Sequence, residues 1–184
     1  MWNKGLSYRE RHGLIEKNMN TKLNDDVNST IDKAEYNNSL GLVFFPAFDW
    51  KISETHPERQ ERLLYTRDQI VEEGLLDIPN IREYNPIVAD WDTIERVHVG
   101  APDLESWVTE AHRVSAGGAI AAAEAVMRGE VDRAFALVRP PGHHAMAMVH
   151  GIRGFCTINI EAVMIQHMRQ TYGIKRIAVV DTDV

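Results

Sequence analysis

Cysteine is almost absent from this chain of 184 residues, which has a single one, Cys156. One thiol cannot form a disulfide within the chain, so a hydrophobic core must hold the fold together. Hydrophobic residues make up 44% of the sequence, which is enough for a core in one domain or part of one. We expect Cys156 to be a small, buried apolar residue, with a reactive thiol as the alternative.

The chain also lacks long apolar runs and an excess of positive charge. No run approaches the length of a membrane span, and the N-terminus lacks the charged and apolar regions of a secretion signal. The net charge is -7, from 20 basic and 27 acidic residues, which is the wrong sign for a nucleic-acid-binding protein. We therefore expect a cytoplasmic protein that binds neither membranes nor nucleic acids. The charge is compatible with a cationic substrate.

The composition changes abruptly near residue 40. Residues 1–40 are polar and rich in asparagine, which predicts a partly ordered extension with a helix near residues 8–19. Residues 41–184 alternate between short apolar runs and segments with helical periodicity. Strands are predicted at 42–45, 81–84, 134–138 and 176–180, and helices at 58–73, 91–98, 114–127 and 160–172. This pattern predicts an α/β fold with an open parallel sheet and helices on both faces.

Two histidines follow one of the predicted strands. After residues 134–138 the chain passes through Arg139-Pro140-Pro141-Gly142 into His143 and His144. The prolines cannot continue a ladder of hydrogen bonds, and the glycine permits a tight backbone turn. Ligands of open parallel sheets bind at the carboxyl ends of the strands, so we expect both imidazoles at the floor of a crevice.

Two aspartates follow the strand predicted at 176–180. Asp181 and Asp183 are two positions apart, and strand alternation places their side chains on the same side. Two carboxylates near two imidazoles suit a metal site or an aspartate-oriented general base. Each feature alone also has a purely structural interpretation, as a satisfied histidine or as a helix cap.

Together these motifs resemble those of the zinc-dependent histone deacetylase family and its bacterial amidohydrolase relatives, including acetylpolyamine and acetoin-utilisation types. The resemblance covers roughly residues 41–184 and implies an arginase/deacetylase type of fold. The matching segments are 139–145, Gly154-Phe155-Cys156 with Asn159, 180–184, the spacing across 111–129, and His56-Pro57-Glu58-Arg59 with Arg62.

The resemblance implies a role for each site residue. His144 would be the main general base, and His143 its electrostatic partner, oriented by Asp181. Asp183 matches the first zinc ligand of the family. Fe2+ and Co2+ also suit these ligand types, and a structural K+ would lie near the two aspartates.

Further roles concern the substrate and its channel. Phe155 would line a narrow acyl-lysine channel, and the Gly154 carbonyl would accept a hydrogen bond from the substrate amide. Cys156 and Asn159 would be structural residues near the site. Arg62 would be a buried arginine that tethers glycine-rich backbone at the foot of the channel, with a surface charge as the alternative.

The resemblance also predicts a truncated fold, the N-terminal part of a catalytic domain at residues 41–184. In the family a histidine ligand follows the Asp-x-Asp-Val run, and an aspartate ligand and a tyrosine lie further on, whereas this chain ends at residue 184. For the full-length protein we expect zinc-dependent hydrolysis of acetyl-lysine or an acetylated polyamine. The alternatives are a non-catalytic remnant, one half of a split protein with a complementary chain, or a two-metal hydrolase of the arginase type. An unpaired strand at 176–180 would favour self-association.

Overall fold

The structure is a computed structural model that describes residues 38–99, 108–149 and 152–183. The helix predicted near residues 8–19 and nearly all of the predicted N-terminal extension lie outside the described residues. Within the described segments, no helix combines the length and apolar character needed to cross a membrane.

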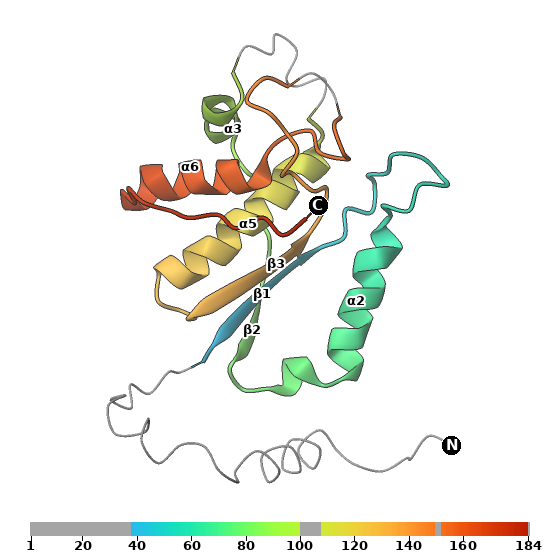
Figure 1. Cartoon of the computed structure of the whole chain (residues 1–184). Coiled ribbons are helices and arrows are strands. Elements are labelled where there is room, and N and C mark those ends of the chain that lie inside the picture. Colours follow the sequence, from blue (N-terminus) through green and yellow to red (C-terminus); the bar gives the residue numbers. More distant parts are fainter. Residues whose placement is uncertain (1–37, 100–107, 150–151, 184) are drawn as a thin grey trace, which may run out of the picture. The chain divides into compact units, whose positions relative to one another are not determined.

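A parallel sheet of three strands forms the centre of the described fold (Figure 1). Strand β1 (Leu40–Phe45) lies between β2 (Ile81–Tyr84) and β3 (Arg133–Val138), and it pairs in parallel with both. Val43 at the middle of β1 is fully buried. The uncharged run of β1 thus has the character expected of a central strand in a parallel sheet.

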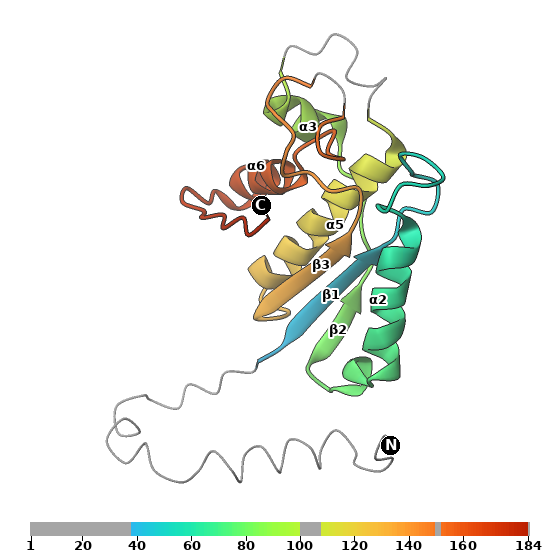
Figure 2. The ribbon, with the colours of Figure 1, turned by 45° about the vertical axis from the view of Figure 1, so that its right-hand side comes forward.

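Helices cover both faces of this sheet, as the sequence predicted (Figure 2). Helix α5 (Glu110–Met127) packs on one face, against β1 and β3, and α2 (Gln60–Glu72) lies on the other. Side chains alternate along β1, so Val43 packs against α5 while the Phe44 ring lies 5.4 Å from the Arg67 guanidinium of α2.

The close approach of α5 depends on Gly117 and Gly118. A methyl group added at Gly117 would lie 1.8 Å from the carbonyl oxygen of Ile87, and one added at Gly118 would lie 2.7 Å from Val138 Cγ1. Glycine lowers helix stability by about 1 kcal/mol relative to alanine. This close packing explains why glycine occupies both positions.

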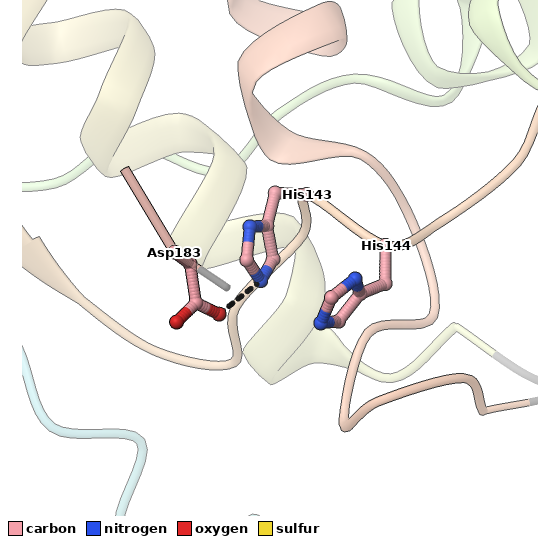
Figure 3. Close-up of side chains that lie close together, drawn as sticks. All are labelled: His143, His144 and Asp183. Carbon is pink, nitrogen blue, oxygen red and sulfur yellow. Dashed lines mark ion pairs between the residues drawn. The ribbon is translucent and has the colours of Figure 1, made fainter. Parts of the chain in front are cut away.

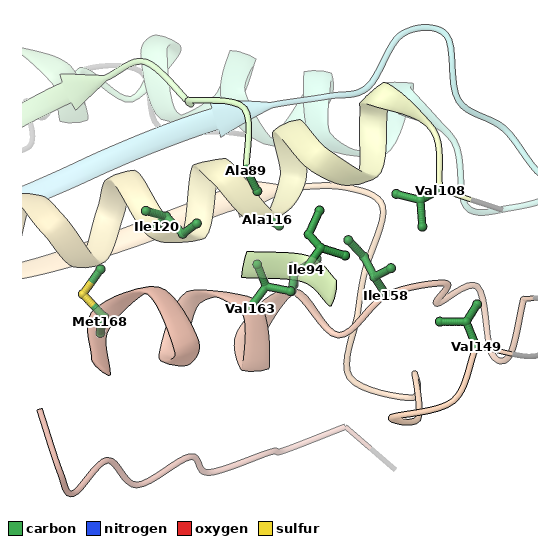
Figure 4. Packing of buried hydrophobic residues seen from close by; sticks show 10 residues of the cluster. Ala89, Ile94, Val108, Ala116, Ile120, Val149, Ile158, Val163 and Met168 are labelled. Carbon is green, nitrogen blue, oxygen red and sulfur yellow. The ribbon is translucent and has the colours of Figure 1, made fainter. Parts of the chain in front are cut away.

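A second layer packs on the outer side of α5. This layer contains α3 (Trp91–Val97) and α6 (Ile160–Tyr172). A short 3-10 helix, η1 (Leu75–Asp77), is not part of it and follows α2. The main hydrophobic core lies between α5, α3 and α6 (Figure 4). Ile94 and Val163 are fully buried there, and Met168 is 2% exposed.

The prediction of a strand at residues 176–180 is wrong. The backbone from residue 173 to 183 forms no strand, and residues 175–183 are exposed. A strand requires a ladder of hydrogen bonds with a neighbour. In the described structure β3 pairs only with β1, so apolar character alone did not make this segment a strand.

Candidate functional site

The His143-His144 pair lies just past the carboxyl end of β3. The turn before it is anchored from two sides, because Ser115 Oγ of α5 donates a hydrogen bond of 2.7 Å to the Pro140 carbonyl and Gly142 lies against the start of α6. A methyl group at Gly142 would be 2.4 Å from the Ile160 nitrogen. The glycine therefore lets the turn pass directly over the start of α6.

His143 lies between two carboxylates, and Figure 3 shows one of them, Asp183, beside the two histidines. Its Nδ1 is 2.9 Å from Asp181 Oδ2, and its Nε2 is 3.1 Å from Asp183 Oδ2. The hydrogen bond with Asp181 raises the pKa of His143. The pKa of Asp181 is lowered, first by the hydrogen bond of 3.1 Å from the Asp183 amide and then by His143. The arrangement favours the ion pair of an imidazolium and a carboxylate.

His144 lies beside His143 and is more exposed. The two ring centroids are 4.0 Å apart, with an interplanar angle of 38°. Gly154 packs on the other side of His144, where an added methyl group would be 2.2 Å from His144 Cδ2. The φ angle of Gly154 is 52°, so glycine is required at this position for both its backbone and its lack of a side chain.

Three of these side chains form a cluster that could hold a metal ion. A ring nitrogen of His143, a ring nitrogen of His144 and an Asp183 carboxylate oxygen all lie within 4.8 Å of one another. Imidazole nitrogen and carboxylate oxygen are ligands that suit Zn2+, and also Fe2+ or Co2+. These donor types suit the metal that the sequence resemblance implies, but the resemblance assigns only Asp183 as a ligand and gives both imidazoles catalytic roles.

A hollow of about 370 Å³ lies beside His143. Its lining comes from His143, from the end of the chain at Val179, Val180 and Asp181, and from α6 and its cap at Asn159, Glu161, Ala162 and Ile165. This hollow adjoins His143 but not His144, whereas both imidazoles were expected to line one crevice, and residues 179–181 form one of its sides.

Phe155 marks another side of the site. It follows Gly154 in a tight turn that is closed by a pair of backbone hydrogen bonds of 2.9 Å between Arg153 and Cys156. The Phe155 side chain is 41% exposed. Its ring meets the edge of His56, with centroids 4.6 Å apart. Two segments distant in sequence therefore meet at this aromatic contact.

Cys156 and Asn159 follow Phe155 in the sequence and have structural contacts near the site. Cys156 is fully buried, and this burial raises the pKa of its thiol, so the prediction of a buried apolar residue is confirmed. Asn159 caps α6 by accepting a hydrogen bond of 2.8 Å from the Ala162 amide. Its own backbone N–H donates to Nε2 of the buried His98, 2.9 Å away. The expected structural role of Asn159 agrees with these contacts, which hold the start of α6 against the buried His98.

The prediction of a buried arginine was wrong in its position. The Arg62 side chain is 56% exposed, and it pairs with Glu58 at 2.9 Å. The buried arginine is Arg139, which is fully shielded from solvent and pairs with the other oxygen of Glu58 at 2.9 Å. Arg62 lies on the outer face of α2, whereas Arg139 leaves β3 toward the interior. A charged residue directly after an uncharged strand was the signal that the sequence analysis missed.

Comparisons with known proteins indicate the family of this chain. Residues 103–184 match the family described as the histone deacetylase domain. A probable deacetylase from Archaeoglobus fulgidus is 36% identical over 162 residues, which are 78% of this chain and 44% of that protein. The chain belongs to the histone deacetylase family.

Other family members match in part. The polyamine deacetylase HDAC10 of Mus musculus is 30% identical over 158 residues, which cover 73% of this chain and 23% of that protein. A histone deacetylase-like amidohydrolase from Pseudomonas aeruginosa is 47% identical over 75 residues, covering 41% of this chain and 19% of that protein. The chain thus spans less than half the length of these histone deacetylase relatives.

A solved structure shows the same fold. The crystal structure of the HDA15 HD domain aligns with a TM-score of 0.59 at 24% identity, over 73% of this chain and 44% of that one. The predicted fold class is confirmed: this histone deacetylase chain has an open parallel α/β sheet of the arginase/deacetylase type.

Proposed function

We propose that the full-length protein is a metal-dependent deacetylase that hydrolyses the acetyl amide of acetyl-lysine or of an acetylated polyamine. The observation that carries the proposal is the cluster of His143, His144 and Asp183, with Asp181 on the opposite nitrogen of His143. The relatives, which include a probable deacetylase and a polyamine deacetylase, support the same chemistry.

In this proposal each site residue has a different role in catalysis. Asp183 would help to hold Zn2+, Fe2+ or Co2+, and the bound metal would polarise the acyl carbonyl and make a water molecule more acidic. His144 takes the proton of this water as general base and returns it to the leaving amine as general acid. His143, which Asp181 favours in its charged form, stabilises the negative charge that develops on the substrate.

Two residues near the histidines would receive the substrate. The exposed ring of Phe155 would pack along the acyl chain, and the Gly154 carbonyl would accept a hydrogen bond from the substrate amide. Gly154 lies directly against His144, so a substrate held here would place its amide beside the general base. Orientation of this kind contributes strongly to the rates of hydrolytic enzymes.

A second candidate function is that of a binding chain that pairs with a partner. The apolar side chains of Phe135, Val179 and Val180 are 51%, 57% and 85% exposed, respectively. Exposed apolar residues beside an unpaired strand edge favour association with another polypeptide. Catalysis and association can also occur together, if the partner completes the site.

The test of catalysis is His144→Ala in the full-length enzyme. Loss of the general base should lower turnover of acetyl-lysine peptide or acetylated polyamine by about 10²- to 10⁴-fold. His143→Ala should also be severe but leave more activity. His167→Ala is the control, since His167 pairs with Glu124 between α5 and α6 and should leave turnover near normal. Near-normal turnover of a folded His144→Ala enzyme would disprove the assignment.

A further inference from the structure

All three guanidinium nitrogens of Arg139 donate hydrogen bonds to one loop of the chain. Its Nε donates to Glu58 Oε1 at 2.9 Å, and one terminal nitrogen donates to the carbonyls of Pro46 and Ala47 at 2.6 and 2.9 Å. The other terminal nitrogen donates to the Glu58 carbonyl at 3.3 Å. All four acceptors belong to residues 46–58, and the Arg139 side chain is fully buried.

The loop that Arg139 holds has little regular structure of its own. Residues 46–59 connect β1 to α2 without a helix or strand. Ala47 in this loop has a φ angle of 51°, a conformation that L-residues rarely adopt. A backbone of this kind persists only where its surroundings hold it, and the hydrogen bond from Arg139 to the Ala47 carbonyl is one such constraint.

The loop that Arg139 holds also makes aromatic contacts with other segments of the chain. The guanidinium carbon of Arg139 lies 5.0 Å from the centre of the Trp50 ring, and the Trp50 ring contacts the ring of His112 of α5 edge to face, with centroids 5.7 Å apart. At the other end of the loop, His56 meets Phe155. Arg139 itself precedes His143 by only four positions in the sequence. One buried cation therefore connects the loop, the aromatic contact and the histidine turn.

We propose that Arg139 and Glu58 are positioning residues, which hold the loop of residues 46–58 in register with the turn that carries His143 and His144. The role requires arginine, because a lysine ammonium cannot reach a carboxylate and three carbonyls in one plane. It requires glutamate, because an unpaired buried guanidinium would be strongly unfavourable. The part of the proposal that concerns substrate rests on the proposed deacetylase function.

The first test measures amide hydrogen exchange in the full-length protein and needs no activity. Arg139→Lys and Glu58→Gln should each speed exchange about tenfold or more in residues 46–58 and 139–145, with α5 unchanged. Arg62→Lys is the matched control, because it alters the exposed partner of the same glutamate and should leave exchange in both segments unchanged. Faster exchange throughout α5 in Arg139→Lys would show a general stabilising role and overturn the proposal.

The second test is kinetic and uses the full-length enzyme. Displacement of the loop should raise the KM of Arg139→Lys for acetyl-lysine peptide about tenfold, with kcat within about threefold of wild type. A merely destabilised protein would instead lose kcat at unchanged KM, because fewer molecules would be folded, and this result would overturn the proposal. An inactive wild-type enzyme would refute the proposed function, while hydrogen exchange would still decide the role of Arg139.

Discussion

At the scale of single residues, the absence of a side chain at Gly154 allows His144 to lie beside the turn of residues 153–156. We predict that Gly154→Ala lowers deacetylase turnover about tenfold or more, because the added methyl group would lie 2.2 Å from His144 Cδ2 and must displace that ring. The measurement is turnover of the full-length enzyme on acetyl-lysine peptide.

Gly173→Ala is the matched control for this substitution. Gly173 has a φ angle of 66°, similar to the 52° of Gly154, but an added methyl group there would meet no atom within 4 Å. Both variants should lose about 1 kcal/mol of stability from the positive φ angle. Only Gly154→Ala should lose activity, and an equal loss in both variants would contradict the argument.

The buried His112 gives a prediction about pH. Burial lowers the pKa of its imidazole from 6.5 to about 4. The Thr109 N–H donates to its Nδ1 at 3.1 Å, and its Nε2 is buried with no hydrogen-bond partner in the part of the chain that the structure describes. The charged form of His112 is therefore unfavourable in the folded protein.

Because of this lowered pKa, protonation of His112 should make the folded protein less stable as the pH falls. The unfolded chain binds the proton more readily between pH 6.5 and 4, so the contribution of His112 is complete above pH 6.5 and lost as pH falls toward 4. The loss should be about 3 kcal/mol. His112→Gln should remove it, since glutamine suits the same capping position. Urea unfolding of both proteins between pH 4 and 7 measures the difference, and parallel curves would contradict the prediction.

At the scale of elements, local signals determined where most helices and strands lie. Helix α6 has the predicted bounds because Asn159 caps its start and Gly173 ends it with a positive φ angle. The helix predicted at 58–73 begins two residues later, at Gln60, and the helix predicted at 114–127 begins earlier, at Glu110. Helix α2 has no side-chain cap at Arg59, whereas α5 starts at a capping box of Thr109 and His112 that the sequence pattern did not reveal.

The outer edge of β3 leads to a prediction about association. In the described residues this edge has no partner strand, and the neighbouring side chain of Phe135 is 51% exposed. We predict that the 184-residue chain self-associates or is poorly soluble unless a complementary chain covers the edge. Light scattering after gel filtration would measure the mass of the species in solution.

A charge at the same position should reverse this behaviour. Phe135→Lys should lower the associated fraction, because a lysine on an edge strand opposes pairing with a second sheet. Tyr65→Lys is the control, since Tyr65 is 67% exposed on α2, outside the sheet. If the unaltered chain is a monodisperse monomer with a cooperative thermal transition, the prediction of association through the edge of β3 is wrong.

At the scale of the whole molecule, the described residues supply only part of a tightly bound metal site. A catalytic zinc site uses about three protein ligands and keeps a position open. Asp183 is one candidate ligand, but its side chain is 62% exposed. The proposed mechanism needs His144 free to carry a proton, so it cannot be a permanent ligand as well.

We therefore predict that the 184-residue chain alone neither retains zinc nor catalyses. Metal content after dialysis, together with a deacetylase assay on acetyl-lysine peptide, measures both properties. Asp183→Asn should change neither result in this chain, but it should abolish metal-dependent activity in the full-length enzyme. One zinc retained per chain, with turnover that a chelator removes, would show that His143, His144 and Asp183 suffice.

The amino-acid sequence by itself determined the class of fold, the places of most elements and the identity of the site motif. These properties are local: apolar runs, helix caps and the Arg-Pro-Pro-Gly-His-His turn are encoded within a few neighbouring residues. The pairing of His143 with Asp181 was also foreseen, though from the family resemblance and not from the pattern of residues.

Tertiary structure alone decided which charges are buried and which strands pair. Arg62 and Arg139 both lie near Glu58, but only Arg139 is enclosed, through contacts with residues 81 to 93 positions away in the sequence. The apolar segment of residues 176–180 remained unpaired, since a strand needs hydrogen-bonding partners that its own sequence does not contain. Both carboxylates converge on His143 for the same reason: the contact depends on how distant segments pack, and no local pattern specifies that packing.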